Sequence, residues 1–356
     1  MLFNVETDTG SRLTGYVVPD SFSGRPRITV RWGGTGLLTL EASESRQALV
    51  AAGRHATGQC GFTVDETHIR GLENIADLEL FDADTGILIY RRRPPGTLVD
   101  LNIFRLETHL LPLWRLDDSL NYKFKYWYKG IDRHGRETST QLFCLNNCIS
   151  SYASGRLLYK NYEFYLVKGL MTVALLRDPY DELAERLLVL NMAREDGEQL
   201  LGARDALIFE ETIAFVAELQ TFEEDELRRL FRRLPNSVIA ALSNPLVRQL
   251  TASTPDEMPN LGSIATALDA LSSFTIVGLR SNTGHFLAAI ADLIGIDAAA
   301  LPMLDEFPRV SELGERLRKI GLIECFLEKD LELYHQTATA FAKIGTHARV
   351  AIGSKP

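Results

Sequence analysis

The sequence predicts an α/β protein in which a small antiparallel β-sandwich precedes a mostly parallel sheet flanked by helices. Up to about residue 93, short runs of alternating apolar and polar residues are separated by glycine-rich turns, as in antiparallel strands. Beyond that point, short apolar runs alternate with stretches whose apolar residues recur every three or four positions, as in buried strands between helices. Pro94-Pro95-Gly96 separates the two patterns and predicts a boundary between a module at 1–93 and a domain at 94–356.

In the first module, the clearest strand pattern is RITVRW, where Ile28, Val30 and Trp32 share one face. The GGTG that follows predicts a turn before LLTLEA. Farther along, DLELF and ILIYRR flank DADTG at 82–86, which has the composition of a hairpin loop. These short strands and turns together predict the sandwich.

The second domain contains three apolar runs that we expect to be parallel strands, at 99–104, 171–176 and 274–279. Helical spacing is found in LAERLLVLNMA, TFEEDELRRLFRRL and GHFLAAIADLIGI. The stretch 190–272 shows helical patterns only, which predicts a helical insertion or lid.

Two helix starts carry capping signals. Asp178 precedes Pro179, so we expect Asp178 to cap a helix that has proline at its first position. Thr221 and Glu224 have the spacing of a capping box and predict the start of another helix.

Composition narrows the class of protein. The 356 residues include 38 Lys+Arg and 47 Asp+Glu, a net charge of −9 that argues against general nucleic-acid binding. The four cysteines are too scattered for a disulfide scaffold or a zinc site: Cys60, Cys144, Cys148 and Cys325. The start, MLFNVETDTGSRLTG, lacks the pattern of a signal peptide, and no stretch approaches the roughly 18 apolar residues of a membrane span. We therefore expect a soluble, cytoplasmic protein with no membrane span.

Four motifs in the second domain follow one another in a characteristic order: VALLRDPYDELAERLL, SNPLVRQLTAS, FTIVGLRSNTGHFLAAIADLIG and LIECFLEKDLELYHQTATAFAKI. Over roughly residues 98–344, this order resembles the P-loop-like, nucleotide-dependent sulfotransferases, especially the branch that acts on carbohydrates. The resemblance implies a sulfate donor, 3′-phosphoadenosine-5′-phosphosulfate (PAPS), a polysaccharide acceptor and no metal. Within it, the Arg177-Asp178-Pro179 segment corresponds to the element that binds the 3′-phosphate of the donor.

Two positions depart from that family. Its members hold the 5′-phosphosulfate with a glycine-rich loop after the first strand, but VDLNIFRLETHLLPLW contains no glycine here. Arg105 replaces the lysine of that loop as a charge, and Thr108 supplies a hydroxyl. The serine expected eight residues after Arg177 is Glu185, which repels phosphate if it points inward. Either the loop has been rebuilt, or the fold has lost its chemistry.

The first module also resembles a known unit. The segments GYVVPDSFSGRPRITVRW and SRQALVAAGRHATGQCGF are similar to a small β-module attached to polysaccharide-synthesis proteins of alphaproteobacteria. This resemblance implies a bacterial protein of glycan assembly, with polysaccharide-assembly proteins as possible partners.

The candidate donor-binding residues are Arg105, Thr108, Arg177 and Arg280. Arg105 lies at the end of the first expected strand, and Arg280 directly follows the third, so both can reach the ligand edge of a parallel sheet. For each arginine, a structural ion pair is the alternative. Transfer also needs a general base for the acceptor hydroxyl, for which His109 is the first candidate. Glu107 is the second candidate, with helix capping as its alternative role.

The stretch SSYASGRLLYKNYEFYLVKG mixes basic and aromatic residues, which favours contact with an anionic sugar. Arg156, Tyr159 and Lys160 are the predicted substrate-binding residues. The alternation of Tyr162 and Phe164 is also typical of an ordinary strand.

Two functional hypotheses follow from these observations. The first is a sulfotransferase that moves sulfate from PAPS to a cell-surface or exported polysaccharide. The second is a non-catalytic glycan-binding or assembly subunit with a degenerate sulfotransferase fold. The missing glycine loop favours the second, and the retained Arg-Asp-Pro favours the first.

Overall fold

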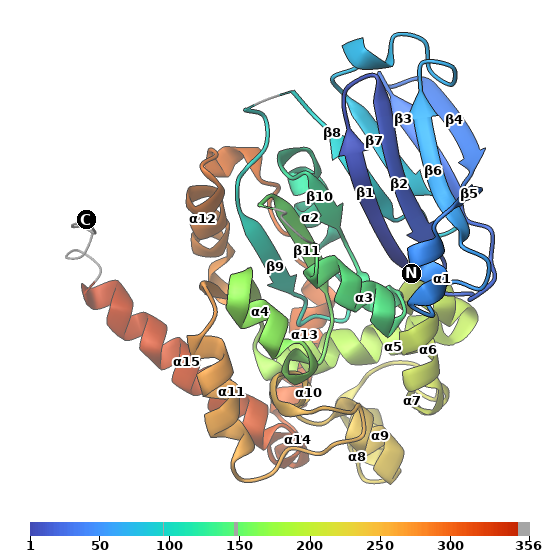
Figure 1. Cartoon of the computed structure of the whole chain (residues 1–356). Coiled ribbons are helices and arrows are strands. Elements are labelled where there is room, and N and C mark those ends of the chain that lie inside the picture. Colours follow the sequence, from blue (N-terminus) through green and yellow to red (C-terminus); the bar gives the residue numbers. More distant parts are fainter. Residues whose placement is uncertain (95, 146–148, 348–356) are drawn as a thin grey trace. The chain divides into compact units, whose positions relative to one another are not determined.

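The computed structural model describes residues 1–94, 96–145 and 149–347 (Figure 1). Contacts divide the chain into two compact units, one containing 1–103 with 117–154 and the other 104–116 with the chain from 155 onward. The predicted boundary near Pro95 concerns separate folding, which these contacts do not test, so it stays a prediction. Pro95 and Cys148 lie outside the described residues.

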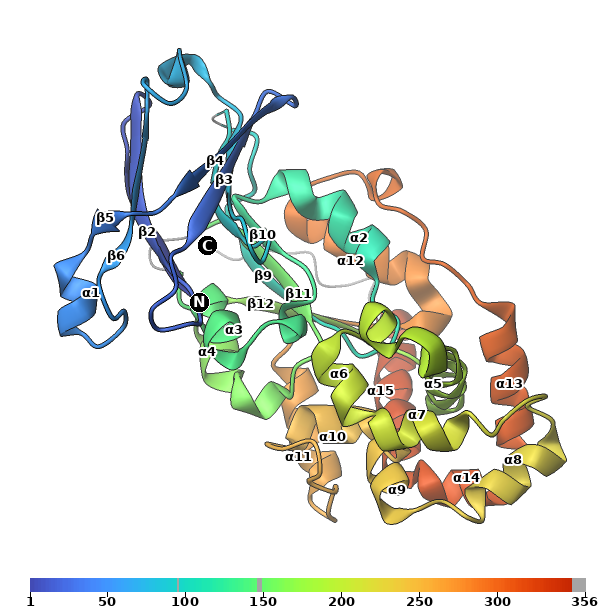
Figure 2. The ribbon, with the colours of Figure 1, turned by 90° about the vertical axis from the view of Figure 1, so that its right-hand side faces the viewer.

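The first unit contains two four-stranded antiparallel sheets, which form two layers in Figure 2. Their strand orders are β1-β2-β6-β5 and β4-β3-β7-β8. The strands are β1 Leu2–Asp8, β2 Arg12–Val18, β3 Arg27–Trp32, β4 Gly36–Glu41, β5 Glu44–Ser45, β6 Gln59–Asp65, β7 Leu78–Asp82 and β8 Leu88–Arg92. The alternation predicted for RITVRW is confirmed, because Ile28 and Val30 are fully buried between exposed or half-buried neighbours.

Both predicted hairpins form. Strand β3 pairs with β4 across the GGTG turn, and β7 pairs with β8 across DADTG. Asp82 fixes the second turn, because its Oδ2 accepts hydrogen bonds from the Thr85 amide at 2.8 Å and hydroxyl at 2.6 Å. Gly86 then takes a φ of +70°, which glycine adopts without steric cost.

A five-stranded sheet has the order β10-β11-β9-β12-β13, with parallel pairing at β10–β11 and β12–β13. Its strands are β9 Asn102–Leu106, β10 Tyr126–Tyr128, β11 Ser151–Gly155, β12 Met171–Leu176 and β13 Ile276–Leu279. The predicted parallel sheet is confirmed, and the three predicted strands are its neighbours β9, β12 and β13. The strand predicted at 99–104 lies farther along the chain. It begins at Asn102 and contains Arg105, which was expected at the strand end.

All residues between β12 and β13 are described, and they form helices and turns without a strand. The helices are α5 Pro179–Leu201, α6 Ala203–Ile208, α7 Glu210–Val216, α8 Glu224–Phe231, α9 Asn236–Leu242, α10 Pro245–Thr251 and α11 Ser263–Ser272. The Thr221 capping box is wrong, because α8 has Glu223 at its N-cap and no side-chain cap. Glu226 instead accepts the amide hydrogens of the preceding turn, including that of Thr221.

The remaining helices are α1 Gln47–Ala51, α2 Trp114–Leu120, α3 Arg136–Phe143, α4 Glu163–Gly169, α12 Thr283–Ile294, α13 Pro308–Arg318, α14 Gly321–Phe326 and α15 Glu328–His347. Contacts of α4 with β12 and of α12 with β13 place helices against the sheet. The alternation of Tyr162 and Phe164 was misleading, because it continues into α4 and not into a strand. None of the helices in the described part of the chain is long and apolar enough to cross a membrane.

Candidate functional site

The predicted donor residues lie near the carboxyl ends of three neighbouring strands. Arg105 is in β9, Arg177 directly follows β12, and Arg280 directly follows β13. Ligands of open α/β sheets usually bind at this edge. We call the group formed by these three arginines with Glu107, His109 and Glu185 the carboxyl-edge cluster.

Arg177 reaches this edge because the Arg177-Asp178-Pro179 segment joins strand to helix. Asp178 is the N-cap of α5 and accepts a hydrogen bond from the Tyr180 amide at 3.0 Å, and Pro179 is the first helical residue. The capping prediction is therefore confirmed. Eight residues on, Glu185 faces back toward the sheet and forms a buried ion pair with Arg177. Burial lowers the pKa of Arg177, but the nearby carboxylates outweigh burial and hold that pKa above its ordinary value.

Glu107 organises the loop at 107–113, which follows β9. Its carboxylate accepts hydrogen bonds from the Arg105 guanidinium at 2.8 Å and from the Leu113 amide at 2.8 Å. It also accepts from His109, through the backbone amide at 3.3 Å and through Nδ1 at 3.2 Å. Burial alone raises the pKa of Glu107, but the charge of Arg105 and the His109 contact lower it well below its usual range.

Glu185 completes this arrangement from α5, because its second oxygen accepts the Leu111 amide hydrogen at 3.1 Å. Two carboxylates of the protein therefore take the amide hydrogens of His109, Leu111 and Leu113. The Thr108 hydroxyl is also engaged, since it donates to the Leu175 carbonyl at 2.6 Å. These three amide hydrogens and the Thr108 hydroxyl, which could otherwise bind an anion, are therefore used within the protein.

His109 does not reach solvent. Its side chain is 1% exposed, and its Nε2 is buried without a hydrogen-bond partner. Glu107 is buried as well. Both candidate bases therefore lie below the surface, and a general base must contact the proton that it removes. Their assignment as catalytic residues stays a prediction.

A cavity of about 450 Å³ opens beside Arg177 and Arg280. Its lining includes two arginines and three carboxylates: Arg177, Arg280, Asp178, Asp181 and Glu306. The Arg280 guanidinium donates to the Asp305 carbonyl through Nη2, and its Nη1 is buried without a partner. Burial and the charge of Arg177 lower the pKa of Arg280. The cavity thus combines a free donor with an excess of negative side chains.

The predicted sugar-binding residues do not form one surface. Tyr159 is buried, packs against Phe274 with ring centroids 5.2 Å apart, and its hydroxyl lies 3.1 Å from Ser273 Oγ. Arg156 forms an ion pair with Asp205, and Lys160 is exposed. Their role in binding a glycan stays a prediction.

Three further arginines lie close to Arg156 but were not singled out from the sequence: Arg186, Arg204 and Arg248. Arg186 directly follows Glu185 in α5, and Arg248 lies inside the SNPLVRQLTAS motif, so both positions belong to segments that the sequence motifs include. Periodicity predicts which face of each helix is apolar, but it does not show that these faces meet.

No group of three or more His, Cys, Asp or Glu side chains in the described part of the chain is arranged to hold a metal ion. No protein-family model, curated protein or solved structure matches the chain. The likeness to sulfotransferases therefore rests on the four motifs in the sequence.

Proposed function

We propose that this protein is a non-catalytic glycan-binding or assembly subunit with a degenerate sulfotransferase-like fold. The observation that carries the proposal is the internal use of the donor site. Glu107 and Glu185 accept the arginine and amide hydrogens that the phosphates of PAPS need.

The energetic argument follows from burial. A phosphate at the 107–113 loop must displace Glu107 or Glu185, and both carboxylates are buried. Removing one partner of a buried ion pair costs about 3–5 kcal/mol, because the other charge is left uncompensated. The new phosphate contacts must first offset this cost before any net affinity results. The same proposal includes a polysaccharide ligand, a cytoplasmic location and polysaccharide-assembly proteins as partners.

Sulfate transfer from PAPS to a polysaccharide is the second candidate. The cavity of about 450 Å³ beside Arg177 and Arg280 favours it, because Arg280 Nη1 is a buried donor without a partner. In that case Arg105 and Arg177 would neutralise the donor, and His109 or Glu107 would accept the proton of the acceptor hydroxyl.

Titration calorimetry and thermal shift with adenosine 3′,5′-bisphosphate separate the two candidates. We expect no change in melting temperature at millimolar nucleotide. A bound nucleotide stabilises the fold by about 2.7 kcal/mol at a hundredfold excess over its dissociation constant. Saturable binding that is lost in Arg177→Ala would overturn the proposal in favour of sulfate transfer.

Glu185→Gln is the matched variant for this experiment. Glutamine keeps an acceptor for the Leu111 amide but removes the charge that holds Arg177. If Glu185 closes the phosphate site, weak nucleotide binding appears in Glu185→Gln and is absent from the unmodified protein. Equal binding by both proteins contradicts this explanation.

The glycan part has its own test, which is affinity electrophoresis in gels that contain an acidic or a neutral polysaccharide. The net charge of −9 works against non-specific attraction to polyanions, so retardation in the acidic gel indicates a specific site. Unchanged migration in every gel contradicts glycan binding.

A further inference from the structure

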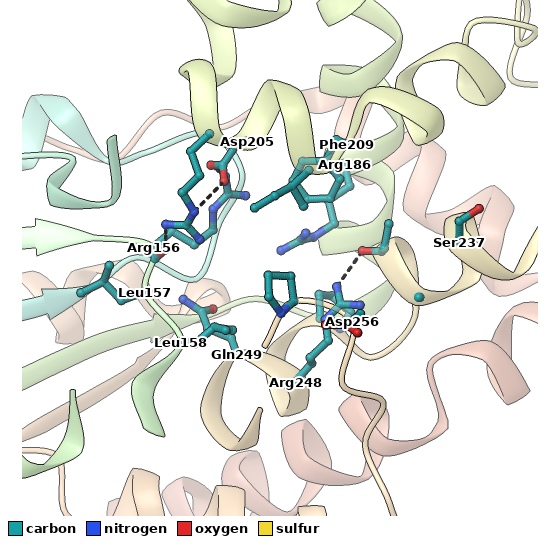
Figure 3. A pocket seen from close by; sticks show the side chains of 16 residues that line it. Arg156, Leu157, Leu158, Arg186, Asp205, Phe209, Ser237, Arg248, Gln249 and Asp256 are labelled. Atoms are coloured by element: carbon teal, nitrogen blue, oxygen red, sulfur yellow. Dashed lines mark hydrogen bonds and ion pairs between the residues drawn. The ribbon is translucent and has the colours of Figure 1, made fainter. Parts of the chain in front are cut away.

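A second pocket, of about 340 Å³, lies within the second unit and is formed by the loop after β11 and by four helices, α5, α6, α9 and α10 (Figure 3). Four arginines and two aspartates line it, which gives an excess of two positive charges: Arg156, Arg186, Arg204, Arg248, Asp205 and Asp256. Apolar side chains, including Leu157, Ile208 and Phe209, form much of the remaining wall.

Arg248 is the central residue of this pocket. The residue is 8% exposed, and its Nη2 donates a hydrogen bond to the Ala241 carbonyl at 2.8 Å. Its Nη1 is buried and has no hydrogen-bond partner. In the part of the chain that the structure describes, no carboxylate forms an ion pair with Arg248. A buried guanidinium in this state is costly, because it has lost its hydration without a compensating anion.

The other arginines are held in place by carboxylates. Arg186 Nε donates to Glu182 at 2.9 Å, Arg156 forms an ion pair with Asp205, and Arg204 Nε lies 3.7 Å from the same carboxyl group. Figure 3 shows Arg186 and Arg248 reaching into the pocket from different helices. Burial, reinforced by the charge of Arg186, lowers the pKa of Arg248 to about 10, and Asp330 opposes this change. Two guanidinium groups therefore share a space in which the positive charge is incompletely neutralised.

Asp330 does not form an ion pair with Arg248, because its carboxylate accepts hydrogen bonds from backbone amides. Its two carboxylate oxygens accept the amide hydrogens of Leu246 at 2.9 Å and Val247 at 2.8 Å, at the start of α10. It thus fixes the helix that carries Arg248. Arg248 itself lines the pocket, and the carboxylate of Asp330 does not form an ion pair with it.

We propose that this pocket binds a small organic monoester of phosphate or sulfate, with the oxyanion between Arg248 and Arg186 and the organic group against the apolar wall. A guanidinium presents paired donors that match the oxygens of a tetrahedral oxyanion. The Phe209 ring and neighbouring aliphatic side chains suit a compact apolar or aromatic body. This site is independent of the carboxyl-edge cluster, because none of its charged residues belongs to that cluster, although Arg156, a predicted glycan-binding residue, also lines it.

Calorimetry on the full chain tests the proposal with phenyl phosphate and phenyl sulfate, with benzoate and phenol as comparison ligands. We expect saturable binding of at least one ester, weaker binding of benzoate and none of phenol. The tighter of the two esters identifies the source of the oxyanion. Absence of saturable binding of both esters at about 10 mM, roughly ten times a millimolar dissociation constant, overturns the proposal.

Arg248→Met is the decisive variant, because methionine keeps much of the apolar volume and removes the charge. We expect the affinity for the ester to fall about tenfold or more, as for loss of a charge-assisted hydrogen bond. The melting temperature without ligand should not fall, because the unpaired buried charge is gone. Unchanged affinity in a folded Arg248→Met protein overturns the proposal.

Two further variants complete the test. Arg204→Gln changes a lining arginine whose side chain is 38% exposed, so it tests the pocket even where Arg248→Met does not fold. It should weaken binding of the ester, and unchanged affinity counts against the site. Arg232→Gln removes an exposed arginine that does not line this pocket and should leave the affinity unchanged. An equal loss in Arg232→Gln indicates non-specific attraction and overturns the proposal.

Discussion

Arg177 forms a buried ion pair with Glu185. This ion pair favours a structural role for Arg177 over phosphate binding. The two side chains are both buried, and Glu185 also accepts the Leu111 amide hydrogen. Glu185 therefore supplies an internal anion for Arg177. In the structure, Arg177 is both a structural partner and part of the wall of a cavity.

Arg177→Met should lower the free energy of unfolding by about 3–5 kcal/mol, because Glu185 is left as an unpaired buried charge. The double variant Arg177→Met/Glu185→Gln should recover most of this loss, since glutamine is neutral and still accepts the Leu111 amide. Urea denaturation of the single and double variants measures the coupling between the two residues. Asp178→Ala serves as a control and should cost about 1 kcal/mol through the lost cap. Additive effects of the two substitutions would show that the ion pair is unimportant.

The raised pKa of Asp181 predicts how the stability of the protein depends on pH. Burial, followed by the charge of Asp178, raises the pKa of Asp181 from 3.8 to about 6. Between these values the folded state binds more protons than the unfolded state, so this residue makes the free energy of unfolding fall as pH rises from about 4 to 6. Asp181→Asn should therefore melt higher than the unmodified protein at pH 7.5 and equally at pH 4. The half-buried position keeps the difference small, since solvent screens the charge. A difference that is equal at both pH values would refute this assignment.

At the scale of elements, helix packing explains why the Val-Gly-Leu strand has a glycine at position 278. Helix α12 packs against strand β13. A Cβ atom on Gly278 would lie 2.8 Å from Cβ and Cγ of Phe286, a residue of α12. Real Cβ atoms do not approach so closely, so a side chain at this position must push the helix away from the sheet. The glycine is therefore required by packing at the edge of the candidate site.

Gly278→Ala should destabilise the protein by about 1–3 kcal/mol through overpacking. Gly284→Ala is the matched control, because a Cβ atom there meets open space at the start of α12. Alanine at position 284 should be neutral or stabilising by up to about 1 kcal/mol, since alanine is the better helix former. Thermal unfolding of both variants provides the comparison, and equal melting temperatures would contradict the packing argument.

The elements that were predicted correctly are those with a long, clean pattern. Strand β3 alternates over six residues, and β12 is an apolar run, interrupted only by Thr172, after which Asp178 and Pro179 begin a helix. Strand β10 was missed because three residues, YWY, are too few to show a period. The displaced end of β9, beyond residue 104, has another cause. A buried arginine looks polar in the sequence, and its ion pair with Glu107 helps to make Arg105 compatible with a position inside a strand.

The candidate site was predicted only in part, for a related reason. The rule that parallel strands end at one edge correctly placed Arg177 and Arg280 beside one cavity. It did not predict that Glu107 turns inward to accept amide hydrogens, because that depends on the path of the loop. The arginine pocket was missed because its members come from separate helices, whose packing no local pattern reveals.

At the scale of the whole molecule, residues 117–154 belong with the sandwich. Arg91 in β8 is buried and donates hydrogen bonds to the Asn121 and Phe124 carbonyls at 2.6 and 2.7 Å. The Tyr128 hydroxyl donates to the Leu88 carbonyl at 2.9 Å. The first compact unit therefore contains chain from both sides of Pro94-Pro95-Gly96.

This arrangement predicts the fate of a chain cut near the proline pair. A specific protease site inserted after Gly96 should be cleaved readily, and the two fragments should remain together in size-exclusion chromatography without denaturant. The reason is that the hydrogen bonds of Arg91 with Asn121 and Phe124 join chain segments on both sides of the cut.

Arg91→Met removes these hydrogen bonds and should let the cleaved fragments separate at a lower urea concentration. If the fragments of the unmodified sequence separate at once and each unfolds cooperatively, residues 1–93 are an independent domain. The boundary predicted from the sequence then describes the folding units better than the contacts do.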